Sequence, residues 1–109
     1  ITGTEPEMSD CLRIDGEIMK LANIDQYEKI LIVDATNGAR LETFAVSDRP
    51  GSGRMVASGA VANHIREGDE IGIMAFTWSS ETGGNFSNIL VDEDNHFVRY
   101  LTEIEGMKL

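Results

Sequence analysis

The sequence predicts a small barrel of the mainly β class that also contains one or two short helices. An Asn37-Gly38 turn between two apolar segments is a strong signal for a β-hairpin. Other short segments rich in apolar residues are separated by glycine, proline, aspartate and asparagine, which favour turns. A chain of 109 residues is long enough for one packed core, so we expect a single domain over residues 1–109.

The first elements are expected after a polar and mixed segment, residues 1–10. Residues 12–14 alternate in polarity and predict a short strand. Asp15 suits the N-cap of a helix over Gly16–Ala22, because its carboxylate can accept hydrogen bonds from the N–H groups of the first turn. The apolar stripe of that helix consists of Ile18, Met19, Leu21 and Ala22.

The hairpin is expected to use residues 27–34, which are mostly apolar and β-branched, and residues 41–46, which alternate. Asn37-Gly38 tolerates the positive φ of a primed turn between such strands. Because side chains alternate across a strand, Thr43 and Arg40 lie on opposite faces of the second one. Leu41 and Ala45 share the face of Thr43, while Glu42, Phe44 and Val46 share that of Arg40. An ordinary half-buried hairpin with a solvated arginine has the same pattern.

The second half of the chain is expected to continue as short strands joined by turns. The predicted strands are residues 55–57, 71–77, 87–91 and 96–101. Loops or turns are predicted at residues 50–53, 66–70, 79–85 and 92–95. Residues 58–62 have small side chains, which let another segment of backbone approach closely.

The composition argues against several classes of function. The net charge is −10 at pH 7 and the Lys and Arg residues are scattered, so electrostatics oppose binding to nucleic acid or anionic lipid. A small anionic substrate would need one positioned cation. The single cysteine, Cys11, excludes an intrachain disulfide, and two histidines without paired cysteines argue against a metal site. With no long apolar stretch and no secretory signal pattern, we expect a cytoplasmic protein without a membrane partner.

Several short motifs keep a fixed order and spacing over most of the chain. They are Asn37-Gly38-Ala39-Arg40, residues 42–46, Gly51-Ser52-Gly53, Gly59-Ala60 and Gly68-Asp69. In order and separation they resemble the pyruvoyl-dependent aspartate 1-decarboxylase family, from about Ile1 to Phe76 and more weakly beyond. The resemblance implies a double-psi β-barrel assembled as a homotetramer, with active sites between subunits. It also implies a lyase whose substrate is a small amino acid, aspartate or a relative of it, and whose products are a β-alanine-type amine and carbon dioxide.

In this family the proenzyme cleaves itself at a Gly-Ser bond, and the serine becomes the pyruvoyl group. Asp10 and Cys11 occupy the matching positions here. A thiol can form the thioester that corresponds to the serine ester, so Cys11 is a candidate catalytic residue and Asp10–Cys11 a candidate self-cleavage bond. Asp10 retains part of the tolerance of glycine for strained turns. A small buried hydrophobic role for Cys11 is an equally open interpretation.

The resemblance implies further site residues, position by position. Thr43 matches the threonine that donates a hydrogen bond to the scissile carbonyl, where negative charge develops. Arg40 matches the arginine that pairs with a substrate carboxylate, for which a planar guanidinium is well suited. Gly59 and Ala60 match the backbone that lines the substrate pocket, and together with Arg40 and Ser58 they are the candidate substrate-binding residues.

Three departures separate the chain from the family pattern. Phe44 replaces the tyrosine that donates a proton after decarboxylation, and a phenyl ring cannot donate. Ser58 replaces an asparagine. The family's active-site lysine lies on a first strand that has no counterpart in this sequence.

Two other functions stay open at the level of sequence. An unprocessed relative would be a non-catalytic barrel that acts as a binding or regulatory module and retains an anion pocket at Arg40. An enzyme that uses Cys11 directly as a nucleophile would need a general base, and neither His64 nor His96 stands in a recognisable pairing.

Overall fold

The computed structural model describes residues 1–76 and 89–101. This part of the chain contains β1 (Gly3–Glu5), β2 (Cys11–Asp15), α1 (Gly16–Ala22), β3 (Lys29–Asp34), β4 (Arg40–Asp48), β5 (Met55–Ser58), the 3₁₀-helix η1 (Gly59–Asn63), β6 (Ile71–Ala75), β7 (Ile89–Val91) and β8 (Phe97–Tyr100). The predicted mainly β class with short helices is confirmed.

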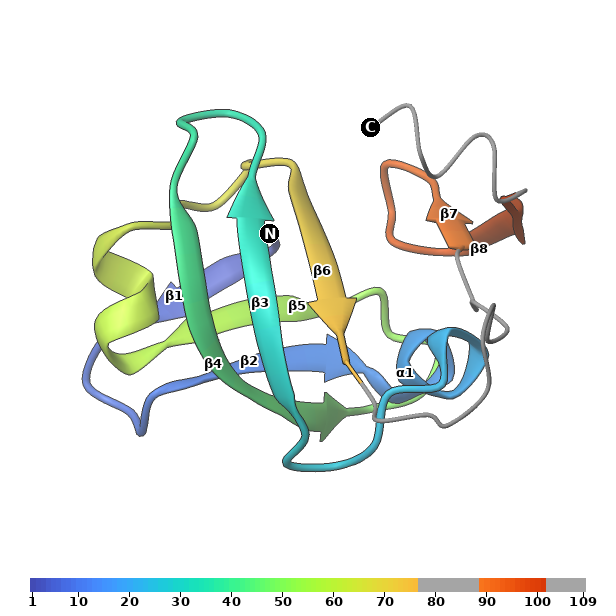
Figure 1. Cartoon of the computed structure of the whole chain (residues 1–109), viewed down its shortest axis with the longest axis horizontal. Coiled ribbons are helices and arrows are strands. Elements are labelled where there is room, and N and C mark those ends of the chain that lie inside the picture. The colour runs from blue at the N-terminus through green and yellow to red at the C-terminus, as the bar shows by residue number, and fades with distance from the viewer. Residues whose placement is uncertain (77–88, 102–109) are drawn as a thin grey trace.

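Six of the strands form one sheet in the order β1-β5-β2-β4-β3-β6, and β7 and β8 form a separate hairpin. The pairs β1–β5 and β2–β4 are parallel, and the other pairs are antiparallel. Strand β4 joins the two halves of the sheet, because residues 40–44 pair with β3 and residues 45–48 pair with β2. In Figure 1, β3, β4 and β6 run side by side across β2 and β5, which lie behind them.

The core lies between these two halves of the sheet. Its most deeply buried large side chains, with at most 1% exposed area, are Leu12, Ile14, Ile30, Ile32 and Ile65. Alternation along β3 turns Ile30 and Ile32 inward and leaves Leu31 and Val33 on the outer side. Each large aliphatic side chain buried in this way contributes roughly 1.5–3 kcal/mol to folding.

Helix α1 has the predicted bounds, and Asp15 is its N-cap as predicted. Oδ1 of Asp15 accepts a hydrogen bond from the backbone N–H of Glu17 at 2.9 Å. The helix ends at Asn23, which adopts the left-handed conformation with φ 61°. Ile18 and Met19 are the buried members of its predicted apolar stripe.

The predicted hairpin is present, but its turn differs from the predicted one. Five residues, 35–39, connect β3 to β4, and only Gly38 among them has a positive φ, 80°. The expectation of a primed turn with positive φ at both Asn37 and Gly38 is therefore wrong. The reason is Asp34, whose Oδ1 accepts hydrogen bonds from the N–H groups of Thr36 at 2.8 Å and Asn37 at 3.2 Å. This carboxylate organises a wider loop.

Two elements had no clear signal in the sequence. Strand β1 lies in the segment described above as polar and mixed, where it pairs with β5 more than fifty residues away. Helix η1 forms in the segment of small residues, 58–62. Strand ends differ by a few residues from prediction: β4 extends to Asp48, and β6 ends at Ala75.

Several predictions fall partly or wholly outside the described residues. These are the loop at 79–85, residue 77 at the end of one predicted strand, and residues 87–88 at the start of another. The predicted turn at residues 92–95 is present, since Oδ1 of Asp92 accepts from the N–H of Asp94 at 2.8 Å and that of His96 at 3.0 Å.

Candidate functional site

The segment around the Asp10–Cys11 bond meets three other elements of the sheet. Cys11 is the first residue of β2 and lies directly opposite Ser58, the last residue of β5. Thr43 comes from β4, which is the other neighbour of β2. Gly59 follows Ser58 and begins η1. Five of the predicted site residues are therefore brought together, although they are spread over about fifty positions of sequence.

The side chain of Asp10 contacts two hydrogen-bond donors. Its Oδ1 accepts from the backbone N–H of Val61, on η1, at 3.1 Å. Its Oδ2 accepts from Oγ1 of Thr43 at 3.5 Å, which is long for a hydroxyl donor and marks a weak hydrogen bond. Thr43 is 3% exposed, so its hydroxyl faces the interior and Asp10 rather than solvent. The amide of Val61 is a backbone group, which no sequence motif reveals.

Gly59 is packed directly against the Asp10–Cys11 segment. Its φ is +70°, and a Cβ at this position would lie 2.6 Å from Cα and 2.7 Å from the backbone nitrogen of Asp10. No side chain fits at that separation, and positive φ disfavours one in any case. The predicted close approach of backbone in the small-residue segment is thus confirmed at Gly59. Its neighbour Ala60 is exposed on η1.

Cys11 is partly buried, and its thiol is held in the neutral form. Burial raises its pKa, the negative charge of Asp10 raises it further, and the hydroxyl of Ser58 lowers it in part. A raised pKa reduces the fraction of thiolate at neutral pH, which is the nucleophilic form. Ser58 is fully buried. While the thiol is neutral, its Oγ makes no hydrogen bond within residues 1–76 and 89–101, but it lies near enough to Cys11 to donate to the thiolate, which is how it lowers the pKa. A buried polar atom without a partner, directly across from Cys11, is a rare feature.

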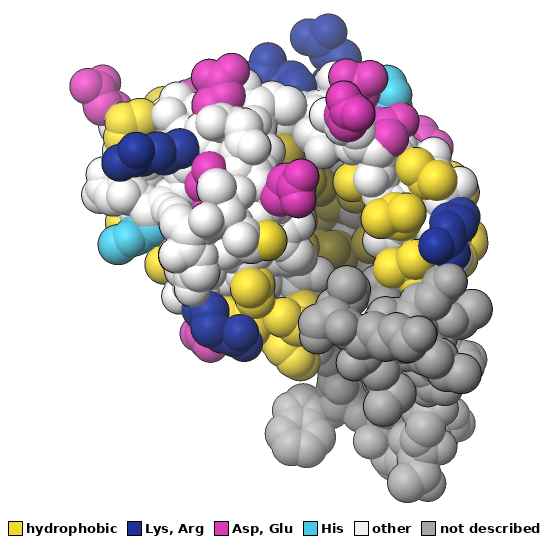
Figure 2. Space-filling model, turned by 90° about the horizontal axis from the view of Figure 1, so that it is seen from above, with side chains coloured by type: hydrophobic (Ala, Val, Ile, Leu, Met, Phe, Trp, Pro, Cys, Tyr) yellow, Lys and Arg dark blue, Asp and Glu magenta, His cyan; other side chains and the backbone are white. Residues whose placement is uncertain are grey.

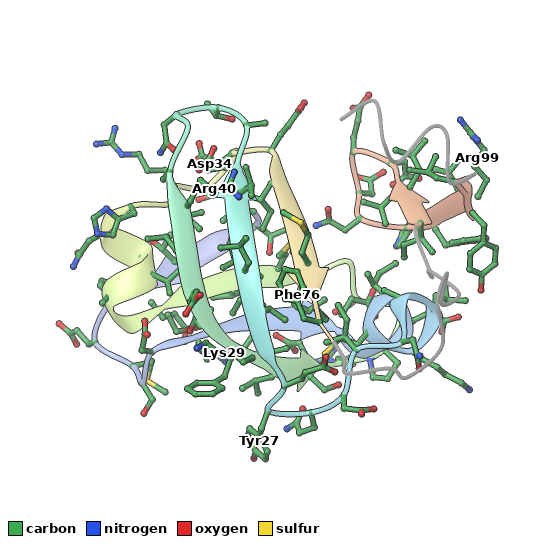
Figure 3. All side chains as sticks on the ribbon, viewed as in Figure 1. Tyr27, Lys29, Asp34, Arg40, Phe76 and Arg99 are labelled. Carbon is green, nitrogen blue, oxygen red and sulfur yellow. The ribbon has the colours of Figure 1, made fainter. Side chains whose placement is uncertain are left out.

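Arg40 lies apart from this cluster. It begins β4 next to the hairpin loop and its side chain is exposed on the face opposite to Thr43, as the alternation predicted. Figure 3 places Arg40 beside Asp34 at the loop end of the hairpin, whereas Lys29 lies toward the other end of the strands. In the described part of the chain the Arg40 guanidinium makes no ion pair or hydrogen bond.

The face of β3, β4 and β6 that carries Arg40 is rich in apolar side chains. We call it the outer apolar face and define it by Leu31, Val33, Phe44, Met74 and Phe76. Phe44 is 51%, Met74 40% and Phe76 70% exposed. A second group of exposed hydrophobic residues lies on the β7–β8 hairpin, at the right of Figure 2, and consists of Leu90, Phe97, Val98 and Tyr100.

A shallow groove lies beside the hairpin loop, away from Cys11, and residues such as Asn37, His64 and Asp69 line it. Within the described ranges, no three His, Cys, Asp or Glu side chains are grouped so that they could hold a metal ion. None of the described helices has the length and apolar character needed to cross a bilayer.

Comparison with known proteins gives a consistent result. A model of the family described as aspartate decarboxylase matches residues 1–98. The aspartate 1-decarboxylase of Mycolicibacterium smegmatis is 40% identical over 90 residues, which cover 80% of this chain and 66% of that protein. That of Clostridium kluyveri is 37% identical over 77% of this chain and 68% of its own length. That of Francisella tularensis subsp. novicida is 36% identical over 84% of this chain and 83% of its own length. With this match and the arrangement around Asp10–Cys11, the chain belongs to the aspartate decarboxylase family.

Proposed function

We propose that this chain is the precursor of a lyase that decarboxylates aspartate or a related amino acid, releasing a β-alanine-type amine and carbon dioxide. The pyruvoyl group of this enzyme would be made from Cys11. The observation that carries the proposal is the meeting of Asp10–Cys11 with Thr43 and Gly59, on a chain whose relatives are aspartate 1-decarboxylases. The substrate is inferred from the names of those relatives.

Formation of the group requires no oxidant or reductant. Sγ of Cys11 attacks the carbonyl carbon of Asp10, the peptide C–N bond breaks, and the nitrogen keeps the thiol proton, which leaves a thioester. Loss of the Cα proton of residue 11 then breaks the Cβ–Sγ bond and releases the segment ending in Asp10 as a thiocarboxylate. Water adds to the dehydroalanine that remains, ammonia leaves, and a ketone is produced. The sulfur therefore departs with the amino-terminal fragment.

The residues around Cys11 fit a pyruvoyl group. The unpartnered hydroxyl of Ser58 lies across from residue 11 and can donate a hydrogen bond to an oxygen formed there. Gly59 has no side chain and therefore leaves room for the backbone of residue 10. The group supplies an electron sink for the loss of carbon dioxide. Phe44 cannot donate a proton to the product, so that proton comes from another donor.

Arg40 would bind the substrate carboxylate in a site shared between subunits. Its guanidinium is exposed, unpaired within the described residues, and lies at the hairpin-loop end of β4, five residues before Ala45, which pairs with Leu12. The surrounding outer apolar face has the character of a buried interface. Both features support a homotetramer in which Arg40 of one chain faces Cys11 of another.

Intact-mass spectrometry of the purified full chain over a long incubation tests the proposal. We expect two fragments separated between residues 10 and 11. The amino-terminal one should carry sulfur in place of one carboxyl oxygen, or be accompanied by released sulfide. Hydrazine should label the ketone on the carboxy-terminal fragment. Cys11→Ala should stay whole, and Cys11→Ser should split without releasing sulfide. A wild-type chain that remains whole, with no ketone to label, overturns the proposal.

A second candidate is an unprocessed member of the family that binds a small anion through Arg40. The raised pKa of Cys11 and the replacement of the proton-donating tyrosine by Phe44 favour it. Calorimetric titration of the whole, unsplit chain with aspartate distinguishes the two. Binding that disappears in Arg40→Ala, without carbon dioxide release, would establish the binding module, whereas carbon dioxide release that requires Cys11 would exclude it.

A further inference from the structure

The oxygen that becomes negative during self-cleavage is the backbone carbonyl oxygen of Asp10. Hydrogen-bond donors near this oxygen would stabilise the charge, and Thr43 is the residue matched to that task. In the structure the Thr43 hydroxyl donates instead to the side-chain Oδ2 of Asp10. An ionised carboxylate is a stronger acceptor than a peptide carbonyl. The Asp10 side chain therefore competes with the reacting carbonyl for the same donor.

The negative charge of Asp10 also opposes self-cleavage. It lies one residue from the thiol and contributes to the raised pKa of Cys11. It also lies next to the carbonyl on which negative charge would develop, and like charges at short distance in a partly buried setting repel each other. Both effects oppose attack by sulfur.

The Asp10 side chain is held in this position by contacts on two sides. Oδ1 accepts the backbone N–H of Val61 at 3.1 Å. The backbone of Asp10 occupies the space that a Cβ on Gly59 would need. The carboxylate is therefore fixed by η1, and it does not depend on the weaker contact with Thr43 for its orientation.

We propose that the Asp10 carboxylate is a brake on cleavage of its own peptide bond, because it engages Thr43 and places a negative charge beside the reacting carbonyl. This inference rests on the proposed function. It assigns Asp10 a positioning role that acts through Thr43 and Cys11. The opposite role, a base that removes the thiol proton, lacks support, since in the described residues both carboxylate oxygens face Val61 and Thr43.

The test compares splitting rates of full-length variants by intact mass. Asp10→Asn keeps an oxygen for the N–H of Val61 but removes the charge, and Asp10→Gly removes the side chain. Asp25→Asn is the matched control, because it removes one charge from an exposed aspartate far from Cys11 in the sequence. We expect both Asp10 variants to split about 10- to 100-fold faster than wild type, which is less than the roughly 100- to 1,000-fold effect of a well-placed oxyanion donor because the Thr43 contact is weak. The Asp25 variant should match wild type.

Thr43→Val gives the second arm of the test. If Asp10 acts by accepting the hydrogen bond of the Thr43 hydroxyl, Asp10→Asn should raise the splitting rate several-fold less when Thr43→Val is also present. Splitting of Asp10→Asn and Asp10→Gly at the wild-type rate, or more slowly, overturns the brake. Thermal unfolding of each variant separates these results from simple loss of the fold.

A readout independent of splitting is the alkylation of Cys11 by iodoacetamide as a function of pH. Cys11 is the single cysteine of the chain, so the added mass reports on it alone. Asp10→Asn should move the midpoint of the curve of alkylation rate against pH to lower pH. An unchanged midpoint counts against the proposal that Asp10 slows cleavage. If no variant splits, the proposed function fails, while a shifted midpoint still supports the effect of Asp10 on the thiol.

Discussion

Asp15 illustrates how one side chain joins two segments of backbone through three hydrogen bonds. It is 1% exposed, and its carboxylate accepts hydrogen bonds from the N–H groups of Glu17, Gly51 and Gly53 at 2.8–2.9 Å. Burial alone would raise its pKa, but the N–H groups of Gly53, Gly51 and Glu17 outweigh this effect, so the pKa is lowered. The residue thus fixes the start of α1 and the loop after β4 together.

We predict that Asp15→Asn destabilises the protein by about 1–3 kcal/mol at neutral pH, because the amide cannot accept all three hydrogen bonds. A lowered folded-state pKa means that Asp15 stabilises the fold above its unfolded-state pKa, and that this contribution is lost as pH falls through the folded-state value. Urea titrations between neutral and strongly acidic pH measure it. The difference between variant and wild type should shrink toward acid, and a constant difference would contradict the assignment.

The pKa of Asp34 is shifted in the opposite direction from that of Asp15. Asp34 is fully buried, with 0% accessible area. If Asp34 and Asp69 are both ionised, Oδ2 of Asp34 has no hydrogen-bond partner among the described residues. Burial raises the pKa of Asp34, and a shared hydrogen bond with Asp69 raises it further while lowering the pKa of Asp69. A proton held by Asp34 and donated to Asp69 gives Oδ2 its partner.

We predict that Asp34→Asn raises stability at neutral pH by about 1 kcal/mol, because its amide can donate to Asp69 without taking up a proton. A raised folded-state pKa gives Asp34 its full stabilising contribution below the unfolded-state pKa, and this contribution is lost as pH rises through the folded-state value. Chemical unfolding at several pH values should show the advantage of the variant growing from acid to neutral pH. A variant that is less stable at every pH would refute the shared proton.

At the scale of elements, η1 and the segment before β2 depend on glycine at position 59. We predict that Gly59→Ala destabilises the protein by more than about 2 kcal/mol, since it combines positive φ with a clash against the Asp10 backbone. Gly38→Ala is the matched control, because its φ is +80° but nothing lies within 4 Å of the added Cβ. That variant should lose only about 1–2 kcal/mol. The melting temperatures of the two variants measure this difference. Equal losses of stability would argue against a close contact between Gly59 and the Asp10 backbone.

The elements also show which features can be predicted from sequence. Helix α1 was predicted with its bounds because its signals, the Asp15 cap and the apolar stripe, are local. Strand β1 was missed because its stabilising partners, Val56, Ala57 and Ser58, are distant in sequence. The hairpin turn was assigned to the wrong class because the carboxylate of Asp34 outweighed the preference of Asn37.

For the candidate site, family resemblance supplied the residues and the structure supplied their arrangement. Neither the hydrogen bond between Asp10 and the Val61 amide nor the unpartnered hydroxyl of Ser58 has a sequence signature, because both depend on how distant strands pair. The opposite faces of Thr43 and Arg40 could be predicted, since alternation along a strand is fixed by backbone geometry.

At the scale of the whole molecule, the outer apolar face predicts an assembly. Phe44→Glu should convert an oligomer to smaller species without unfolding the subunit, because half of the Phe44 side chain is exposed in the single chain and a glutamate there can remain solvated. Light scattering after size-exclusion chromatography measures the mass, and circular dichroism measures the fold. Val98→Glu, on the separate β7–β8 hairpin, is the control. An unchanged mass for Phe44→Glu would place the interface elsewhere.

Strand β4 carries Thr43 on one face and Arg40 on the other, three residues or about 10 Å apart along the strand. With sites shared as proposed, each chain lends the ketone formed at residue 11 to one site and the guanidinium of Arg40 to the next. Chains of Arg40→Ala and Cys11→Ala, each inactive alone, should then complement one another when unfolded and refolded as a mixture. Some mixed sites would contain both intact groups, and part of the carbon dioxide release would return.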